Sequence, residues 1–298
     1  MSGFGEGWDG ALARWADAQV DIRALVQIGS RVQPGARVDA LSDYDYQLVT
    51  THPERYADGA FARELGPCWV SGAHVAFGRA TKVTAVFEGA LEADFVILRH
   101  AEVAVACAAL RWPVTRPLWP ARLRLGIEEF RIVAAPGWRV VKGGAVWERR
   151  YARLSPFRSD LTAREFERLC GEFWTQLVWA AKKRARGEYL ACQWGIHEHL
   201  MGPALRILQE QAHLEGRDSY PLARRAEGWL EANQLSALAG GTRPEPAALA
   251  ASLSDLAGLF EGASAAVAAA KGWRVPATAD VRDWLRDALA RPTGTAPR

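Results

Sequence analysis

Three aspartates and a Gly-Ser turn are the residues of this chain best suited to chemistry. Gly29 and Ser30 follow the apolar segment "IRALVQI", and Asp43 and Asp45 stand one residue apart where the apolar segment "YDYQLVT" begins. Asp94 interrupts a third apolar segment, "ADFVIL". Because side chains alternate along a strand, Asp43 and Asp45 are expected on the same face, with Cα atoms roughly 6.5 Å apart. Two like charges that close are unfavourable without a counterion.

A divalent cation would supply that counterion. Mg²⁺ is held by a small number of carboxylates together with the phosphates of its substrate, and a turn with free amides and a hydroxyl can approach phosphate oxygens closely. If the strands of Asp45 and Asp94 are neighbours, the three carboxylates form one cluster. A D-x-D pair alone is more often a solvated turn or a helix cap than a metal site. Its combination with the Gly-Ser turn and Asp94 favours the metal site.

The first half of the chain contains the elements that must position these residues. The chain has 298 residues, which is long for one core, so two domains are expected. The spacing of Leu12 and Trp15 predicts a helix over 8–18. Residues 1–150 are predicted to form a strand-rich unit of α and β structure. Apolar runs bounded by turn residues predict its strands, over 22–29, 44–50, 68–77, 81–87 and 93–98.

The second half, residues 151–298, is predicted to be helical. Thr162 and Glu165 form a capping-box pattern, and apolar residues then recur at helical spacing from Phe166 to Leu177. The segment "LMGPALRILQEQAHL" predicts another helix. Gly and Pro residues predict a loop over 238–246, and regularly spaced leucines predict a further amphipathic helix beyond it.

Composition argues against several classes of protein. Lys and Arg number 37 against 34 for Asp and Glu, so there is no basic footprint and no nucleic-acid partner is expected. The four cysteines are widely spaced, which predicts reduced thiols and neither a zinc site nor a disulfide framework. The opening stretch "MSGFGEGWDGALARW" shows no basic region followed by an apolar core, and no uninterrupted apolar run reaches membrane-spanning length. We therefore expect a cytoplasmic chain without a membrane partner; its oligomeric state stays open, with a monomer favoured.

The pattern "IGSR…SDYDYQLV…ADFVIL" resembles the signature of the polymerase-β-like nucleotidyltransferase superfamily. A second segment, "EFWTQLVWAAKKRARGEYL", is similar to the E-F-W segment of aminoglycoside 6-adenylyltransferases, the streptomycin-modifying family. The resemblance runs in order from about Arg14 to about Leu230. It implies an α+β protein: an N-terminal polymerase-β-like nucleotidyltransferase domain, with a mixed sheet and flanking helices, followed by a C-terminal helical domain that binds the acceptor. The active site is then expected in the cleft between the two domains.

The implied reaction is transfer of AMP from ATP to a hydroxyl of an aminoglycoside or a similar small polar acceptor, with release of pyrophosphate. By similarity, Ser30 and the backbone around Gly29, with Arg31 beside them, would hold the triphosphate. Asp43 and Asp45 would ligate Mg²⁺. Asp94 would act as the general base on the acceptor hydroxyl, or would share a metal and activate the hydroxyl through a second ion. The sequence does not separate these two roles.

The resemblance also assigns residues of the helical half. Lys182 matches the family's lysine. Lys182 and Arg186 lie four residues apart, on one face of the expected helix, where both side chains could contact a triphosphate. The alternative is a basic helix face that is exposed to solvent. Trp174 or Trp179 could line a sugar or adenine pocket, although most of the 13 tryptophans are expected in packing roles.

Glu188 matches a family acid that could receive an ammonium group of the acceptor; the alternative is a helix pair between Arg184 and Glu188. Here the chain departs from the family, because Gly187 stands where a second acid is usual. That departure puts streptomycin itself in doubt, since a polycation needs carboxylates around it. Two other functions stay open: transfer to a protein or a tRNA end, and a nucleotide-binding module without catalysis.

Overall fold

A six-stranded mixed sheet organises the first part of the chain, in the order β3-β4-β5-β2-β1-β6. All neighbouring strands run antiparallel except β2 and β5, which are parallel. The computed structural model describes residues 7–36, 38–76, 80–111, 119–154, 160–220, 223–241 and 243–291. Its strands are β1 (Ile22–Ile28), β2 (Tyr44–Thr50), β3 (Cys68–Val75), β4 (Thr81–Phe87), β5 (Leu91–Arg99) and β6 (Arg139–Lys142).

The five strands expected from the sequence are all present, and β2 and β4 have the expected bounds. β1 ends one residue early because Gly29 adopts a left-handed φ of 78°. β3 ends at Val75, and the last residue of that predicted strand, Phe77, lies outside the described residues. The short strand β6 was not expected, since four residues carry little periodicity.

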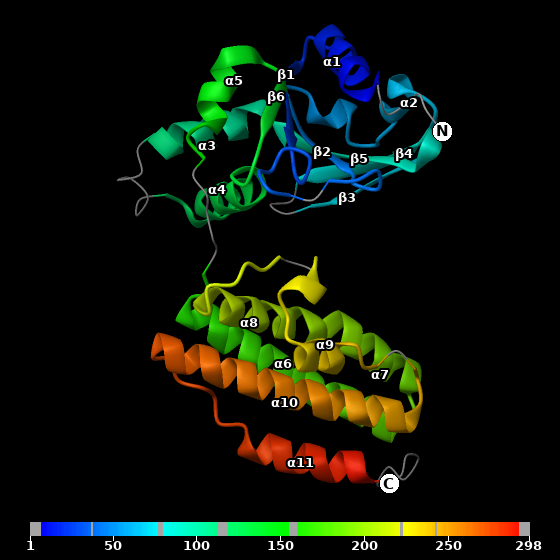
Figure 1. Cartoon of the computed structure of the whole chain (residues 1–298), viewed down its shortest axis with the longest axis vertical. Coiled ribbons are helices and arrows are strands. Elements are labelled where there is room, and N and C mark those ends of the chain that lie inside the picture. The colour runs from blue at the N-terminus through cyan, green and yellow to red at the C-terminus, as the bar shows by residue number, and fades with distance from the viewer. Residues whose placement is uncertain are drawn as a thin grey trace. The chain divides into compact units, whose positions relative to one another are not determined.

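The chain divides into two compact units, Met1–Ser159 and Asp160–Arg298. In the first unit, α1 (Trp8–Ala18) and α2 (Ala62–Leu65) pack on one face of the sheet, while α3 (His100–Arg111), α4 (Ala121–Ala134) and α5 (Gly144–Tyr151) pack on the other (Figure 1). Alternate residues of each strand therefore enter two different cores. In β2, Tyr46 and Leu48 face α1, whereas Val49 faces the core that includes Tyr151 of α5.

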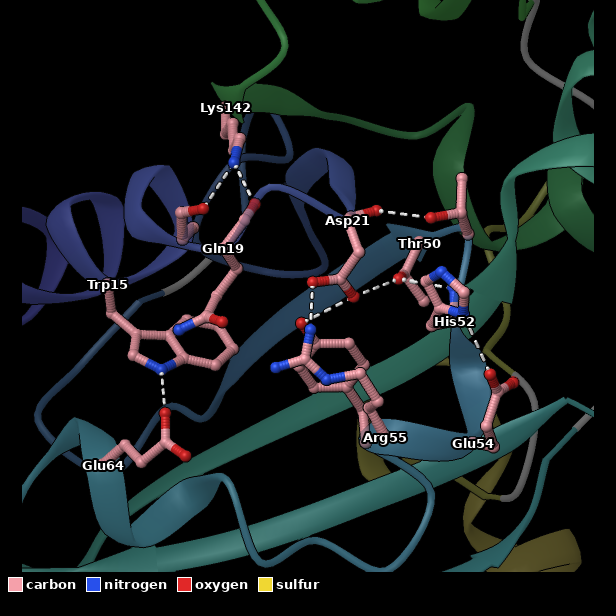
Figure 2. A network of polar contacts seen from close by, with 12 residues as sticks. Trp15, Gln19, Asp21, Thr50, His52, Glu54, Arg55, Glu64 and Lys142 are labelled. Atoms are coloured by element: carbon pink, nitrogen blue, oxygen red, sulfur yellow. Dashed lines mark hydrogen bonds and ion pairs between the residues drawn. The ribbon is translucent and has the colours of Figure 1, made fainter.

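A polar network anchors the end of β1 and β2 at which Ile22 is paired with Thr50 (Figure 2). The buried Asp21 carboxylate accepts hydrogen bonds from the hydroxyls of Thr50 and Tyr56, both at 2.9 Å, and forms an ion pair with Arg55 at 2.6 Å. At the opposite end of the same strand pair, Ile28 is paired with Asp45. One end of this strand pair thus holds Asp21 with its charge compensated by Arg55, and the other end holds the candidate metal ligand Asp45.

The second unit is a set of packed helices, as the sequence predicted. Thr162 and Glu165 form the expected capping box at the start of α6. One helix of the described residues, α10, is long and apolar enough to cross a membrane by length and composition alone. Its buried residues, among them Leu253 and Phe260, lie in the hydrophobic core of this unit, as in the core helix of a globular unit. The helices are α6 (Ala163–Ala185), α7 (Tyr189–Gly195), α8 (Met201–Leu214), α9 (Ala232–Leu238), α10 (Pro246–Lys271) and α11 (Ala279–Ala290).

These observations confirm the expected fold class, a mixed sheet with flanking helices followed by a helical part.

Candidate functional site

The carboxylates of Asp43, Asp45 and Asp94 lie together on one face of the sheet. Each offers an oxygen, and these oxygens all lie within 4.8 Å of one another. Asp45 and Asp94 are direct partners on the parallel strands β2 and β5, and Asp43 immediately precedes β2. Asp94 is 3% exposed, whereas the other two are half-buried. Several carboxylate oxygens at this spacing form a donor set that suits a hard cation such as Mg²⁺.

Gly29 lies directly against this cluster. It follows β1, and its φ of +78° is a conformation that other residues rarely adopt. A Cβ atom on Gly29 would overlap Oδ2 of Asp45 and lie 2.9 Å from its Cγ. The absence of a side chain is therefore what lets the turn approach the carboxylate of Asp45. Ser30, the next residue, is half-buried in the same turn.

Arg31 connects this turn to the segment that carries the aspartates. Its Nε donates to the carbonyl oxygen of Asp43 at 3.0 Å, and a terminal nitrogen donates to that of Ser42 at 2.6 Å. Its guanidinium also lies over the ring of Tyr44, 3.8 Å from the centroid. These contacts fix the start of β2, so Arg31 has a structural role in addition to the nucleotide contact expected from the sequence.

Two residues of β4 contact Asp94, and the sequence analysis missed both. The Thr84 hydroxyl donates to Oδ1 of Asp94 at 2.5 Å, and the Lys82 ammonium forms an ion pair with Oδ2. The signal was available in "TKVTAVF", where Lys82 and Thr84 alternate with residues that face the core. Once β4 and β5 form a hairpin around the turn at Gly89, its register places Thr84 beside Asp94.

In the second unit, Lys182 and Arg186 are both exposed at the end of α6. The Lys182 ammonium lies 5.9 Å from the centroid of the Trp284 ring, and Arg186 directly follows the last residue of α6. Within the second unit alone, Lys182 and Arg186 therefore form an exposed basic surface at the end of α6.

Glu188 forms an ion pair with Lys183 at 2.6 Å. The alternative pair considered from the sequence, between Arg184 and Glu188, is wrong. Arg184 is buried and its Nε donates to the carbonyl oxygen of Pro246 at 2.8 Å. The reason is that α6 ends at Ala185, so Glu188 does not continue the helix that carries Arg184.

The two candidate tryptophans have different surroundings. Trp174 is 7% exposed and packs edge-on against Phe173 and Phe260 in the core, which is a packing position. Trp179 is half-buried and its ring contacts that of Trp194. The Lys183 ammonium lies 5.5 Å from the centroid of the Trp179 ring. Only Trp179 offers part of its ring at the surface.

One further group of possible ligands occurs among the described residues: Asp160, Glu210 and His213. Glu210 is 1% exposed, but its carboxylate already pairs with Lys271 at 2.9 Å and accepts the backbone N–H of Leu161 at 2.9 Å. Its charge is thus compensated by the protein, as in a structural ion pair.

No protein-family model matches this chain, and no curated protein matches it. Among solved structures it is similar to an aminoglycoside 6-adenyltransferase from Bacillus subtilis, with 15% identity and a TM-score of 0.43, over 98% of this chain and 100% of that one. It is also similar to a nucleotidyltransferase-like protein from Exiguobacterium sibiricum 255-15, with 10% identity and a TM-score of 0.37, over 90% of this chain and 78% of that one. These are the kinds of protein that the sequence resemblance names. At such low identity, the function of this chain has to be inferred from its own residues.

Proposed function

We propose that this chain is an adenylyltransferase that transfers AMP from ATP to a hydroxyl of a small polar acceptor. The observation that carries the proposal is the cluster of Asp43, Asp45 and Asp94, whose oxygens lie within 4.8 Å of one another beside the Gly29 turn. Three carboxylates brought this close repel one another, and a divalent cation bound between them would relieve that repulsion. A turn that faces them can receive the phosphates that accompany the cation.

In the proposed step, the acceptor oxygen attacks the α-phosphorus of ATP. A bond forms between that oxygen and phosphorus, and the bond from phosphorus to the oxygen that bridges to the β-phosphate breaks. Pyrophosphate leaves with the electron pair, and the hydroxyl proton passes to the Asp94 carboxylate. Thr84 and Lys82 hold Asp94 in a fixed orientation, and each of its oxygens keeps a second lone pair that can face the hydroxyl proton or the cation.

Asp43 and Asp45 would hold Mg²⁺ together with an oxygen of Asp94. When bound, the ion would withdraw charge from the phosphate under attack. Ser30 and the backbone at Gly29 would contact the triphosphate, since Gly29 lies directly against Asp45 and Ser30 follows it in the same turn.

We further propose an aminoglycoside-like compound as the first acceptor to test. The support is the resemblance of the α6 segment to aminoglycoside 6-adenylyltransferases, in which Lys182, Arg186 and Glu188 would serve the nucleotide and the acceptor. Gly187 weakens the case for streptomycin itself, because a polycation needs carboxylates around it.

The test is AMP transfer by purified protein with ATP and Mg²⁺, scored as a mass gain of one AMP on the acceptor, with streptomycin screened first. We expect Asp45→Asn to reduce transfer at least about a hundredfold while the fold is retained, because a metal contributes several kcal/mol to such a step. Asp17→Asn makes the same change at an exposed position of α1 and should leave transfer unchanged. Full activity of Asp45→Asn would overturn the mechanism.

A second assay identifies the class of acceptor. ATP labelled at the α-phosphate is incubated with a cell lysate and the protein, and the label is followed into small molecules, proteins or RNA. Label in a small molecule supports the proposal. Label in a protein or in tRNA would show that the chemistry is right and the acceptor wrong, and no transfer in either assay would favour a binding module.

A further inference from the structure

Lys82 and Thr84 extend the candidate site across a third strand. Thr84 on β4 is the register partner of Asp94 on β5, which is in turn the partner of Asp45 on β2. Partners in neighbouring strands carry their side chains on the same face, so Thr84, Asp94 and Asp45 form one row across the sheet. Lys82 lies two residues before Thr84 and therefore faces the same side.

The two β4 residues occupy different oxygens of the same carboxylate. Thr84 donates its hydroxyl proton to Oδ1 of Asp94, and Lys82 pairs with Oδ2. The Asp94 side chain is 5% exposed and that of Lys82 is 28% exposed. A carboxylate so deeply buried is costly without a partner. Lys82 supplies that partner permanently, since it is part of the chain.

Lys82 limits how many divalent ions can use Asp94 as a ligand. Asp43, Asp45 and Asp94 carry three formal negative charges, and Lys82 carries one positive charge beside them. One divalent ion together with Lys82 balances the charge of the three carboxylates. In two-metal sites the ions lie about 3.5–4 Å apart and share ligands, so a second ion would compete with Lys82 for Asp94.

We propose that Lys82 takes the place of a second metal ion, so that the centre formed by Asp43, Asp45 and Asp94 works with a single divalent cation. Lys82 and Thr84 are then positioning residues that orient Asp94 toward the acceptor hydroxyl. This inference rests on the proposed function, and it decides between the one-metal and two-metal mechanisms that the sequence left open.

The test counts Mn²⁺ ions bound per chain in the complex with a non-hydrolysable ATP analogue, by electron paramagnetic resonance and equilibrium dialysis. Wild type and Lys82→Arg should each bind one ion. Lys82→Met should bind two, because the fixed positive charge is gone. Lys183→Met removes a lysine from an ion pair in the second unit and should leave the count at one. Two ions in the wild type, or one in Lys82→Met, would overturn the inference.

Mg²⁺ dependence of AMP transfer gives a second readout. At Mg²⁺ concentrations close to that of ATP, Lys82→Met should be at least about tenfold slower than wild type, and excess Mg²⁺ should restore much of the rate by supplying the second ion. A defect that excess Mg²⁺ leaves unchanged would contradict the inference. Failure of the proposed function looks different, because the wild type would then neither retain Mn²⁺ with the nucleotide analogue nor transfer AMP.

Discussion

Replacement of Gly29 by alanine tests whether the turn after β1 positions the proposed metal ligand Asp45. Two effects can be separated at this position. Alanine at a φ of +78° is strained by roughly 1–2 kcal/mol, the usual penalty for a left-handed non-glycine residue. In addition, its Cβ would overlap Oδ2 of Asp45, so the carboxylate would have to rotate away from Asp43 and Asp94. The first effect lowers stability, and the second should weaken metal binding.

Gly35 provides the matched control. Its φ of +73° is nearly the same, but a Cβ there would meet no atom within 4 Å. Gly35→Ala should therefore lower the free energy of unfolding by the same roughly 1–2 kcal/mol without disturbing Asp45. Gly29→Ala should in addition weaken Mn²⁺ binding about tenfold or more, the range found for groups that orient metal ligands.

The assay combines thermal unfolding with Mn²⁺ titration of the wild type and both variants. A drop in stability for both variants, with loss of Mn²⁺ affinity for Gly29→Ala alone, is the expected result. Equal Mn²⁺ affinities for the two variants would refute the idea that the Gly29 turn positions Asp45. Activity measurements then follow the metal affinities, since AMP transfer is proposed to depend on the same carboxylates.

Two buried carboxylates outside the site give further predictions. The hydrogen bonds from Tyr56 and Thr50 hold the pKa of Asp21 below its usual value against the opposing effect of burial, so its stabilisation is complete above about pH 4 and is lost as the pH falls further. Urea unfolding at pH 7 and pH 3 should show a smaller pH effect in Asp21→Asn than in wild type (Figure 2); an equal effect would contradict this role. Glu210→Gln should destabilise the second unit by about 2 kcal/mol, because it weakens the charge-assisted contacts that the buried carboxylate makes with Lys271 and the N–H of Leu161. Glu261→Gln, which removes an exposed pair with Arg282, should cost less than about 1 kcal/mol, and equal losses would refute the distinction.

Much of the fold was predictable because its signals are local. Short apolar runs bounded by turn residues predict β2 and β4 at their observed bounds, and the capping box of Thr162 and Glu165 predicts the start of α6. The convergence of Asp45 and Asp94 needed one further assumption, that their strands are neighbours. Local sequence cannot supply it, because β2 and β5 are separated along the chain by the β3–β4 hairpin, and their parallel pairing depends on the whole sheet.

The site residues that could not be predicted from the sequence are those whose role depends on a contact with another strand or helix. Lys82 and Thr84 look like the solvent-facing residues of an ordinary half-buried strand until the register places them against Asp94. Trp174 belongs to the apolar positions that recur at helical spacing along α6, and its packing against Phe260 shows that it lies in the core rather than in a pocket. In both cases the residue type was visible and the contact was not.

The end of α6 gives the departure at Gly187 a structural reason. Gly187 has a φ of +76°, its N–H donates to the carbonyl oxygen of Arg184, and the N–H of Glu188 donates to that of Lys183. This is the pattern in which a left-handed glycine ends a helix, so an acidic side chain at 187 would conflict with the helix stop. The neighbouring acid, Glu188, is already partly compensated by the Lys183 ammonium. An acceptor that uses Glu188 must therefore share its carboxylate with Lys183, and the net negative charge at this position is smaller than the sequence suggests.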